Sequence, residues 1–141
     1  MEKEQEKGLI YFLYGNLQMA LLSTKHLIEI SEDEKLRRAL LEDMQAFEKF
    51  QAAIVKMRGD RQLKGLTEMA QKGTEFAIDM KTFFNKDTAK LCDMLATGYE
   101  KGIAGLTENL QNATDESEDV KELAKGYLNY LKQAHERYSG F

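Results

Sequence analysis

Apolar residues recur every three or four positions along almost the whole chain, which is the spacing that places them on one face of an α-helix. The first such stretch, LIYFLYGNLQMALL (Leu9–Leu22), is apolar on every side, whereas the second keeps its apolar residues to one stripe that includes Leu36, Leu40, Met44 and Phe47. The chain contains no proline, the residue that most often ends helices. The pattern therefore predicts an all-α protein with helices near 8–30, 33–58, 62–84, 88–112 and 116–138.

Several breaks between these stretches carry residues that typically begin helices. Ser31 is followed three residues later by Glu34, which is the spacing of a capping box. Asp87 precedes TAKL as a candidate N-cap, and Thr114 precedes the acidic run DESED, which suits the positive end of a helix. We therefore expect the second, fourth and fifth helices to begin beside these residues.

The lengths of the connections predict the topology. The first two helices and the last two are joined by about three residues each, and short links make neighbouring helices antiparallel. The middle connection contains its own helix, 62–84, of about 23 residues or ~34 Å. A connector of this length spans the bundle and brings 88–112 parallel to 33–58. The sequence predicts a single domain, 1–141, built from two antiparallel hairpins joined by a long helical crossover.

Three glycines interrupt the helix expected at 88–112. Gly98, Gly102 and Gly105 each cost about 1 kcal/mol relative to alanine inside a helix. Close approach of a neighbouring helix is the usual reason to keep such glycines, and a local kink is the alternative.

Composition and charge narrow the classes of function. The chain has 141 residues, is 43% hydrophobic and 31% charged, and carries a net charge of −4, a profile typical of a globular domain. No basic stripe favours nucleic acid, and Leu9–Leu22 is shorter than the roughly 20 apolar residues of a membrane span. Cys92 is the single cysteine, so no disulfide forms within the chain, which fits a reducing cytoplasm. We expect a cytoplasmic protein that binds neither nucleic acid nor membranes.

Two long segments resemble a known family. FLYGNLQMALLSTKHLIEISEDEKLRRALLED and KDTAKLCDMLATGYEKGIAGLTENL resemble the two hairpin halves of a ferritin-like family of uncharacterised bacterial proteins, and the likeness covers nearly the whole chain. The resemblance implies a ferritin-like four-helix bundle with an added crossover helix. In many relatives it also implies a dinuclear iron or manganese site.

The residues for that metal site are largely missing. Such a site takes a glutamate from each of two helices and Glu-x-x-His from each of the other two. No acidic residue lies between Lys7 and Ile28, and the second helix reads Phe47-Glu48-Lys49-Phe50 where a Glu-x-x-His would stand. We therefore expect a degenerate site without metal or other cofactor. The candidate ligands that remain are His26, Glu29, Glu100 and His135.

No catalytic constellation stands out either. Ser23 precedes His26 by three residues, but a nucleophile also needs an oriented base and an oxyanion site. Cys92 is expected to be a small core residue. The chain contains neither a phosphate-binding loop nor a dinucleotide fingerprint. The sequence predicts no catalytic residues and no enzymatic activity.

The aromatic residues of the first helix suggest an interaction surface. Tyr11, Phe12 and Tyr14 surround Leu13, so a single core cannot face all four. We expect Tyr11, Phe12 and Tyr14 to contribute to self-association, most simply as a homodimer, with helix 62–84 of the same chain as the alternative cover. The function expected is a metal-free structural or interaction module. Two alternatives stay open: a di-iron or di-manganese oxidase or iron-handling protein with an altered site, and a binder of a small apolar ligand.

Overall fold

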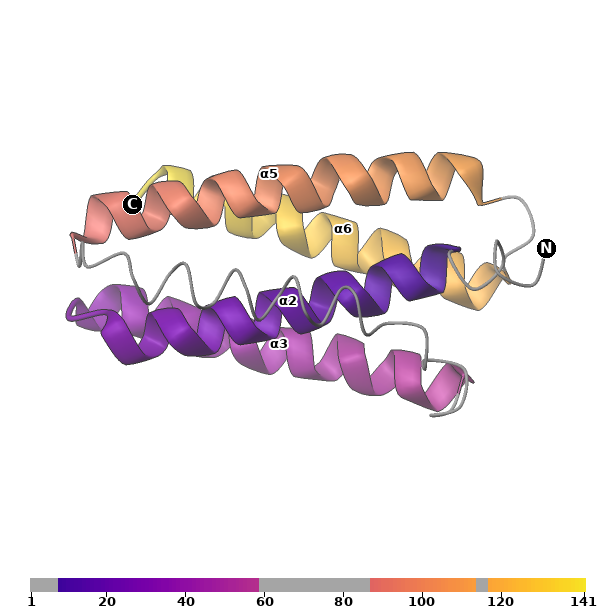
Figure 1. Cartoon of the computed structure of the whole chain (residues 1–141), viewed down its shortest axis with the longest axis horizontal. Helices are drawn as coiled ribbons and strands as arrows, with labels where there is room; N and C mark the ends of the chain where they lie inside the picture. The colour runs from indigo at the N-terminus through magenta and orange to yellow at the C-terminus, as the bar shows by residue number, and fades with distance from the viewer. Residues whose placement is uncertain (1–7, 59–86, 114–116) are drawn as a thin grey trace.

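Four α-helices account for most of the described chain. The computed structural model describes residues 8–58, 87–113 and 117–141. The helices are α2 (Leu9–Ile30), α3 (Glu34–Arg58), α5 (Thr88–Asn112) and α6 (Glu118–Ser139), and no strand occurs in the described ranges (Figure 1). The all-α class is therefore confirmed for these residues. The helix predicted at 62–84 lies outside them.

Side-chain contacts fix the direction of each helix. Tyr14 near the start of α2 meets Gln51 near the end of α3, and Phe12 meets Gly105 near the end of α5. Both α3 and α5 therefore run antiparallel to α2, and so parallel to each other, as Figure 1 also shows. The helix α6 returns antiparallel to α3, because Asp43 contacts Tyr138 and Phe50 contacts Tyr127. The expected parallel direction of 33–58 and 88–112 is thus present.

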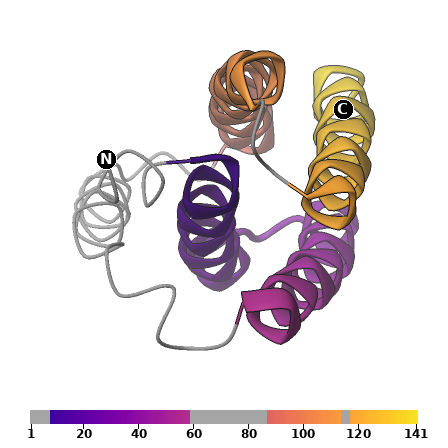
Figure 2. The ribbon, with the colours of Figure 1, turned by 90° about the vertical axis from the view of Figure 1, so that its right-hand side faces the viewer.

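The four helices lie around a common centre (Figure 2), and their buried side chains form one core. Each helix contributes side chains that are almost completely buried, among them Leu13, Leu17, Leu40, Phe47 and Leu106. From α6 the buried residues are Val120, Ala124, Tyr127, Leu131, Ala134 and Tyr138, at the helical spacing seen in the sequence. None of the described helices combines the length and apolarity that crossing a membrane requires.

The ends of the helices show one wrong prediction. Asp33, not Ser31, begins α3, because Oδ1 of Asp33 accepts the amide hydrogen of Leu36 at 2.9 Å. Ser31 instead ends α2, where its amide donates to the carbonyl oxygen of Leu27. The N-cap predicted at Asp87 is confirmed by its bond from the amide of Ala89, at 3.0 Å. Ser117 begins α6, and Thr114 lies outside the described residues.

Candidate functional site

A buried carboxylate lies at the centre of the interface between α3, α5 and α6. Asp43 of α3 is fully buried. Its Oδ2 accepts hydrogen bonds from the hydroxyls of Tyr99, at 3.2 Å, and Tyr138. Its Oδ1 accepts from the hydroxyl of Tyr130 and from Nη1 of Arg137, the latter at 2.9 Å. Each carboxylate oxygen therefore has two donors, which fills the roughly four acceptor positions of the group. We call these five residues the Asp43 network.

Aromatic rings pack around the buried carboxylate of Asp43, while Arg137 at the edge of the network is 36% exposed. Phe47 packs against Tyr99 and Tyr130 with ring centroids 6.3 and 5.6 Å apart, and Tyr99 stacks on Tyr138 at 5.8 Å. Burial raises the pKa of Tyr99 and of Tyr138, and the negative charge of Asp43 raises both further. The three tyrosines therefore stay protonated as donors, and Arg137 supplies the compensating positive charge.

The four candidate metal ligands form two separate pairs. Nδ1 of His26 lies 3.8 Å from Oε2 of Glu29 near the end of α2, and Nε2 of His135 lies 3.4 Å from Oε1 of Glu100 between α6 and α5. No group of three or more histidine, cysteine, aspartate or glutamate residues gathers in the described parts of the chain.

The residues at the bundle centre do not fit a dinuclear metal site. Among the described residues, Asp43 is the fully buried carboxylate, and its described neighbours are a guanidinium and hydroxyls that donate to it rather than further carboxylates or histidines. A metal ion at Asp43 would have to displace these donors. The buried carboxylate is therefore satisfied by hydrogen bonds from the chain itself.

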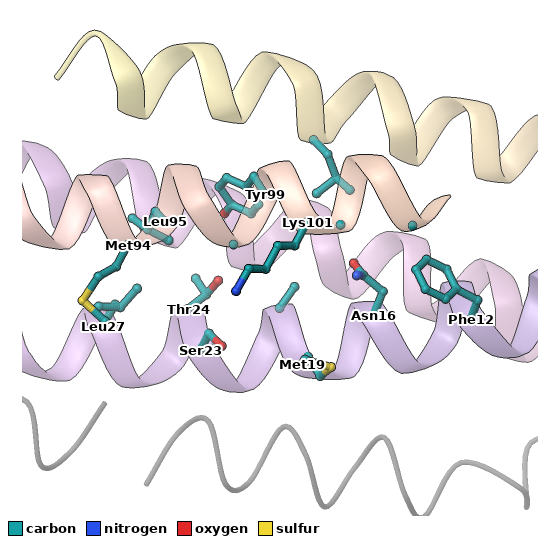
Figure 3. A pocket seen from close by; sticks show the side chains of 15 residues that line it. Phe12, Asn16, Met19, Ser23, Thr24, Leu27, Met94, Leu95, Tyr99 and Lys101 are labelled. Carbon is teal, nitrogen blue, oxygen red and sulfur yellow. The ribbon is translucent and has the colours of Figure 1, made fainter. Parts of the chain in front are cut away.

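A cavity of about 420 Å³ opens between α2 and α5. Figure 3 shows side chains from both helices pointing into it. The described residues that line it are mainly apolar, and they come from α2 (Phe12, Asn16, Met19, Ala20, Ser23, Thr24, Leu27), from α5 (Met94, Leu95, Gly98, Tyr99, Lys101, Gly102, Gly105) and from α6 (Leu131). Tyr99 belongs to both sites, since its ring lines the cavity and its hydroxyl joins the Asp43 network.

The three glycines of α5 shape this cavity in two different ways. A Cβ at Gly105 would lie 2.6 Å from Cζ of Phe12, and one at Gly102 would lie 3.2 Å from Nδ2 of Asn16. These two positions bring α2 and α5 close together, as the sequence predicted. Within the described part of the chain, a Cβ at Gly98 would meet no atom of another element within 4 Å, so this glycine leaves open space in the cavity wall.

Four polar side chains of the described lining, Asn16, Ser23, Thr24 and Lys101, carry hydrogen-bond donors, whereas the hydroxyl of Tyr99 donates to Asp43. Tyr127 donates to Oδ1 of Asn16 at 2.6 Å, which orients the side-chain amide beside Gly102. Lys101 extends from α5 toward Ser23 and Thr24 of α2 (Figure 3). An apolar trough with a few oriented donors is the usual form of a small-molecule site.

The aromatic residues of the predicted interaction surface pack toward different neighbouring helices. Leu13 is fully buried, while Tyr11, Phe12 and Tyr14 are half-buried. Phe12 packs toward α5, and the hydroxyl of Tyr14 accepts hydrogen bonds from Gln18 and, across the gap to α3, from Gln51. Phe12 and Tyr14 are therefore partly covered within the chain.

The sequence did contain a signal for the Asp43 network. Asp43 follows Leu40 by three residues and precedes Phe47 by four, so it occupies a core position of the apolar stripe. We assigned that position to Met44, which is half-buried, and this assignment was wrong. Cys92 is buried as predicted, and burial raises the pKa of its thiol to about 11.

Comparison of the chain with protein-family models, with curated proteins and with solved structures gave no match.

Proposed function

We propose that this protein binds a small, mainly apolar ligand in the cavity between α2 and α5. The observation that carries the proposal is the cavity itself, whose volume of about 420 Å³ lies within the range of about 300–1,000 Å³ typical of ligand sites. Well-packed protein interiors hold few voids larger than a water molecule. A cavity of this size is therefore unusual, and it favours a bound ligand.

Two features of the wall support the proposal. Gly98 keeps open a space that any larger residue would occupy, although a glycine there weakens the helix. Tyr99 is held in one orientation by its bond to Asp43 and by stacking on Tyr138, so one side of the cavity is rigid without a ligand. A preformed wall lowers the entropic cost of binding.

The test is to fill the cavity and measure binding of a neutral apolar fluorophore such as N-phenyl-1-naphthylamine. We expect Gly98→Leu, which adds a side chain to the cavity wall, to weaken binding by about tenfold or more, a loss of about 1.4 kcal/mol. Ala20→Leu, on the α2 wall of the cavity, should also weaken binding of the fluorophore. The matched control is Gly126→Leu, at an exposed glycine of α6 away from the cavity. Unchanged binding in both cavity variants would refute the proposal.

We infer a second function, as an interaction module, from a different observation. Tyr11 remains half-buried on α2, and Leu22 of the same helix is 39% exposed. Eleven residues is close to three helical turns, so Tyr11 and Leu22 share a face. A second copy of the chain is the simplest cover for such a face.

The ferritin-like arrangement is part of the same proposal. It is supported by the two antiparallel pairs, α2 with α3 and α5 with α6, and by the parallel direction of α3 and α5. The cytoplasmic location that the lone cysteine favours belongs to it as well. An experimental structure that includes residues 62–84 would test the crossover.

A further inference from the structure

We propose that the ligand is a single-chain amphiphile with an anionic head, held at Lys101, Ser23 and Thr24. This inference rests on the ligand-binding function proposed above and names the chemical class of the ligand. It comes from the charges and donors of the cavity rather than from its volume.

The charge of the described part of the cavity lining differs from that of the whole chain. The chain carries 24 acidic and 20 basic residues, yet no aspartate or glutamate is among the described residues that line the cavity. Lys101 is the one charged side chain in that lining, and it makes no ion pair with any of the described residues. An ammonium group beside an apolar trough, with no carboxylate in that described lining, is complementary to an anion.

Hydroxyl groups stand near the same ammonium group. Ser23 and Thr24 lie on the opposite wall from Lys101, which extends toward them (Figure 3). A hydroxyl can donate to an anionic oxygen, and a hydrogen bond to a charged group is about twice as strong as a neutral one. Lysine and two hydroxyls therefore form a set of donors suited to a carboxylate or phosphate head.

The rest of the cavity suits a hydrocarbon tail. Side chains such as Phe12, Met19, Leu27, Met94 and Leu95 line it on both sides of the donors. The two methionines are flexible and polarizable, so they adapt to chains of different shape. The volume lies in the lower part of the range for ligand sites, which favours one hydrocarbon chain over the two chains of a membrane phospholipid.

The experiment compares dodecanoate with dodecanol, ligands with the same number of carbons that differ in charge, by calorimetric titration at pH 8. We expect the wild-type protein to bind dodecanoate about three- to tenfold more tightly than dodecanol. Lys101→Met keeps an apolar side chain of similar length and should abolish this preference, because it weakens dodecanoate binding more than dodecanol binding. Lys101→Arg should preserve the preference. Lys125→Met, at an exposed lysine of α6, is the matched control.

The outcomes separate this inference from the function on which it rests. Equal binding of both ligands, or a preference that survives in Lys101→Met, would overturn the anionic head and leave ligand binding intact. Binding of neither ligand would refute the proposed function together with this inference. Binding to vesicles of anionic phospholipid without binding of dodecanoate would overturn the single-chain class.

Discussion

At the scale of single residues, Asp43 links three helices through one carboxylate. Its donors come from α5 (Tyr99) and from α6 (Tyr130, Arg137 and Tyr138). A buried charge is costly unless every acceptor position is filled, so the three helices must keep one register to satisfy it. The Asp43 network therefore contributes to the specificity of packing as well as to stability.

Replacing Asp43 by asparagine tests this reading. The new side chain keeps one acceptor oxygen, but its NH₂ group would face two groups that are themselves donors and leave that pair without an acceptor. We expect the free energy of unfolding to fall by about 2–4 kcal/mol in urea titrations followed by tyrosine fluorescence. Asp93→Asn, at an exposed site of α5, should change it by less than about 0.5 kcal/mol. Equal effects of the two substitutions would contradict a central role for the Asp43 network.

Stability at alkaline pH tests whether the buried tyrosines of the same region resist ionisation in the folded state. Burial raises the pKa of Tyr99, Tyr127, Tyr130 and Tyr138 above the ordinary value of 10.0, so the folded state holds their protons more tightly than the unfolded state. Their contribution to stability is fully present below pH 10 and is lost as the pH rises above it. We expect unfolding free energies measured between pH 9 and 11.5 to stay flat and then fall. Tyr127→Phe should reduce the slope by about 1.4 kcal/mol per pH unit. A slope that is the same in this variant would show that Tyr127 ionises freely in the folded protein.

At the scale of single helices, the glycines of α5 separate the effect of helix propensity from the effect of steric contact with α2. Alanine favours a helix over glycine by about 1 kcal/mol wherever its methyl group fits. At Gly98 the methyl group would meet no described side chain within 4 Å, whereas at Gly105 it would lie 2.6 Å from the Phe12 ring, which must move. We expect Gly98→Ala to raise the free energy of unfolding by about 1 kcal/mol and Gly105→Ala to lower it or leave it unchanged. Thermal unfolding followed by circular dichroism would measure the stability of both variants. Equal stabilisation by the two substitutions would show that the Phe12 ring moves aside at no cost in free energy.

The helices themselves could be predicted because their apolar spacing is a local property. The predicted ranges 33–58 and 88–112 are close to the observed Glu34–Arg58 and Thr88–Asn112. The start of α3 was predicted wrongly at Ser31, because Ser31 and Asp33 are both good N-cap residues and lie only two positions apart. Asp33 accepts the Leu36 amide, and Ser31 is left to end α2.

The functional sites were harder to predict because they depend on contacts between distant parts of the chain. Asp43 and Tyr138 are 95 residues apart in sequence, and only their packing shows that a carboxylate in an apolar stripe has partners. The cavity is lined by Gly98 of α5 together with the small residues Ala20 and Ser23 of α2, which are far from it in sequence. The three glycines indicated in the sequence that α5 is unusual. The sequence did not show that Gly102 and Gly105 allow close contact with α2, whereas Gly98 leaves open space in the cavity wall.

At the scale of the whole molecule, Tyr99 joins the two sites. Its hydroxyl group donates to Asp43 in the Asp43 network, and its side chain lines the cavity between α2 and α5. The pairs α5 with α6 and α2 with α3 pack most extensively, so α2 meets α5 across the less closely packed boundary between the two hairpins. The cavity lies at this boundary, where bundles commonly hold their ligands.

Self-association is the prediction that belongs to this scale. Within the described residues, Tyr11 and Leu22 leave apolar area on the face of α2 that they share. A twofold dimer would cover the face with its own copy. We expect the wild-type protein to sediment as a dimer at micromolar concentration and Tyr11→Glu to sediment as a monomer, because a buried unpaired carboxylate at such an interface is costly. The matched control, Leu41→Glu, places the same charge at a residue of α3 that is 42% exposed, and it should remain dimeric. A wild-type protein that sediments as a clean monomer would end the dimer prediction and favour the alternative in which residues 62–84 of the same chain cover this face.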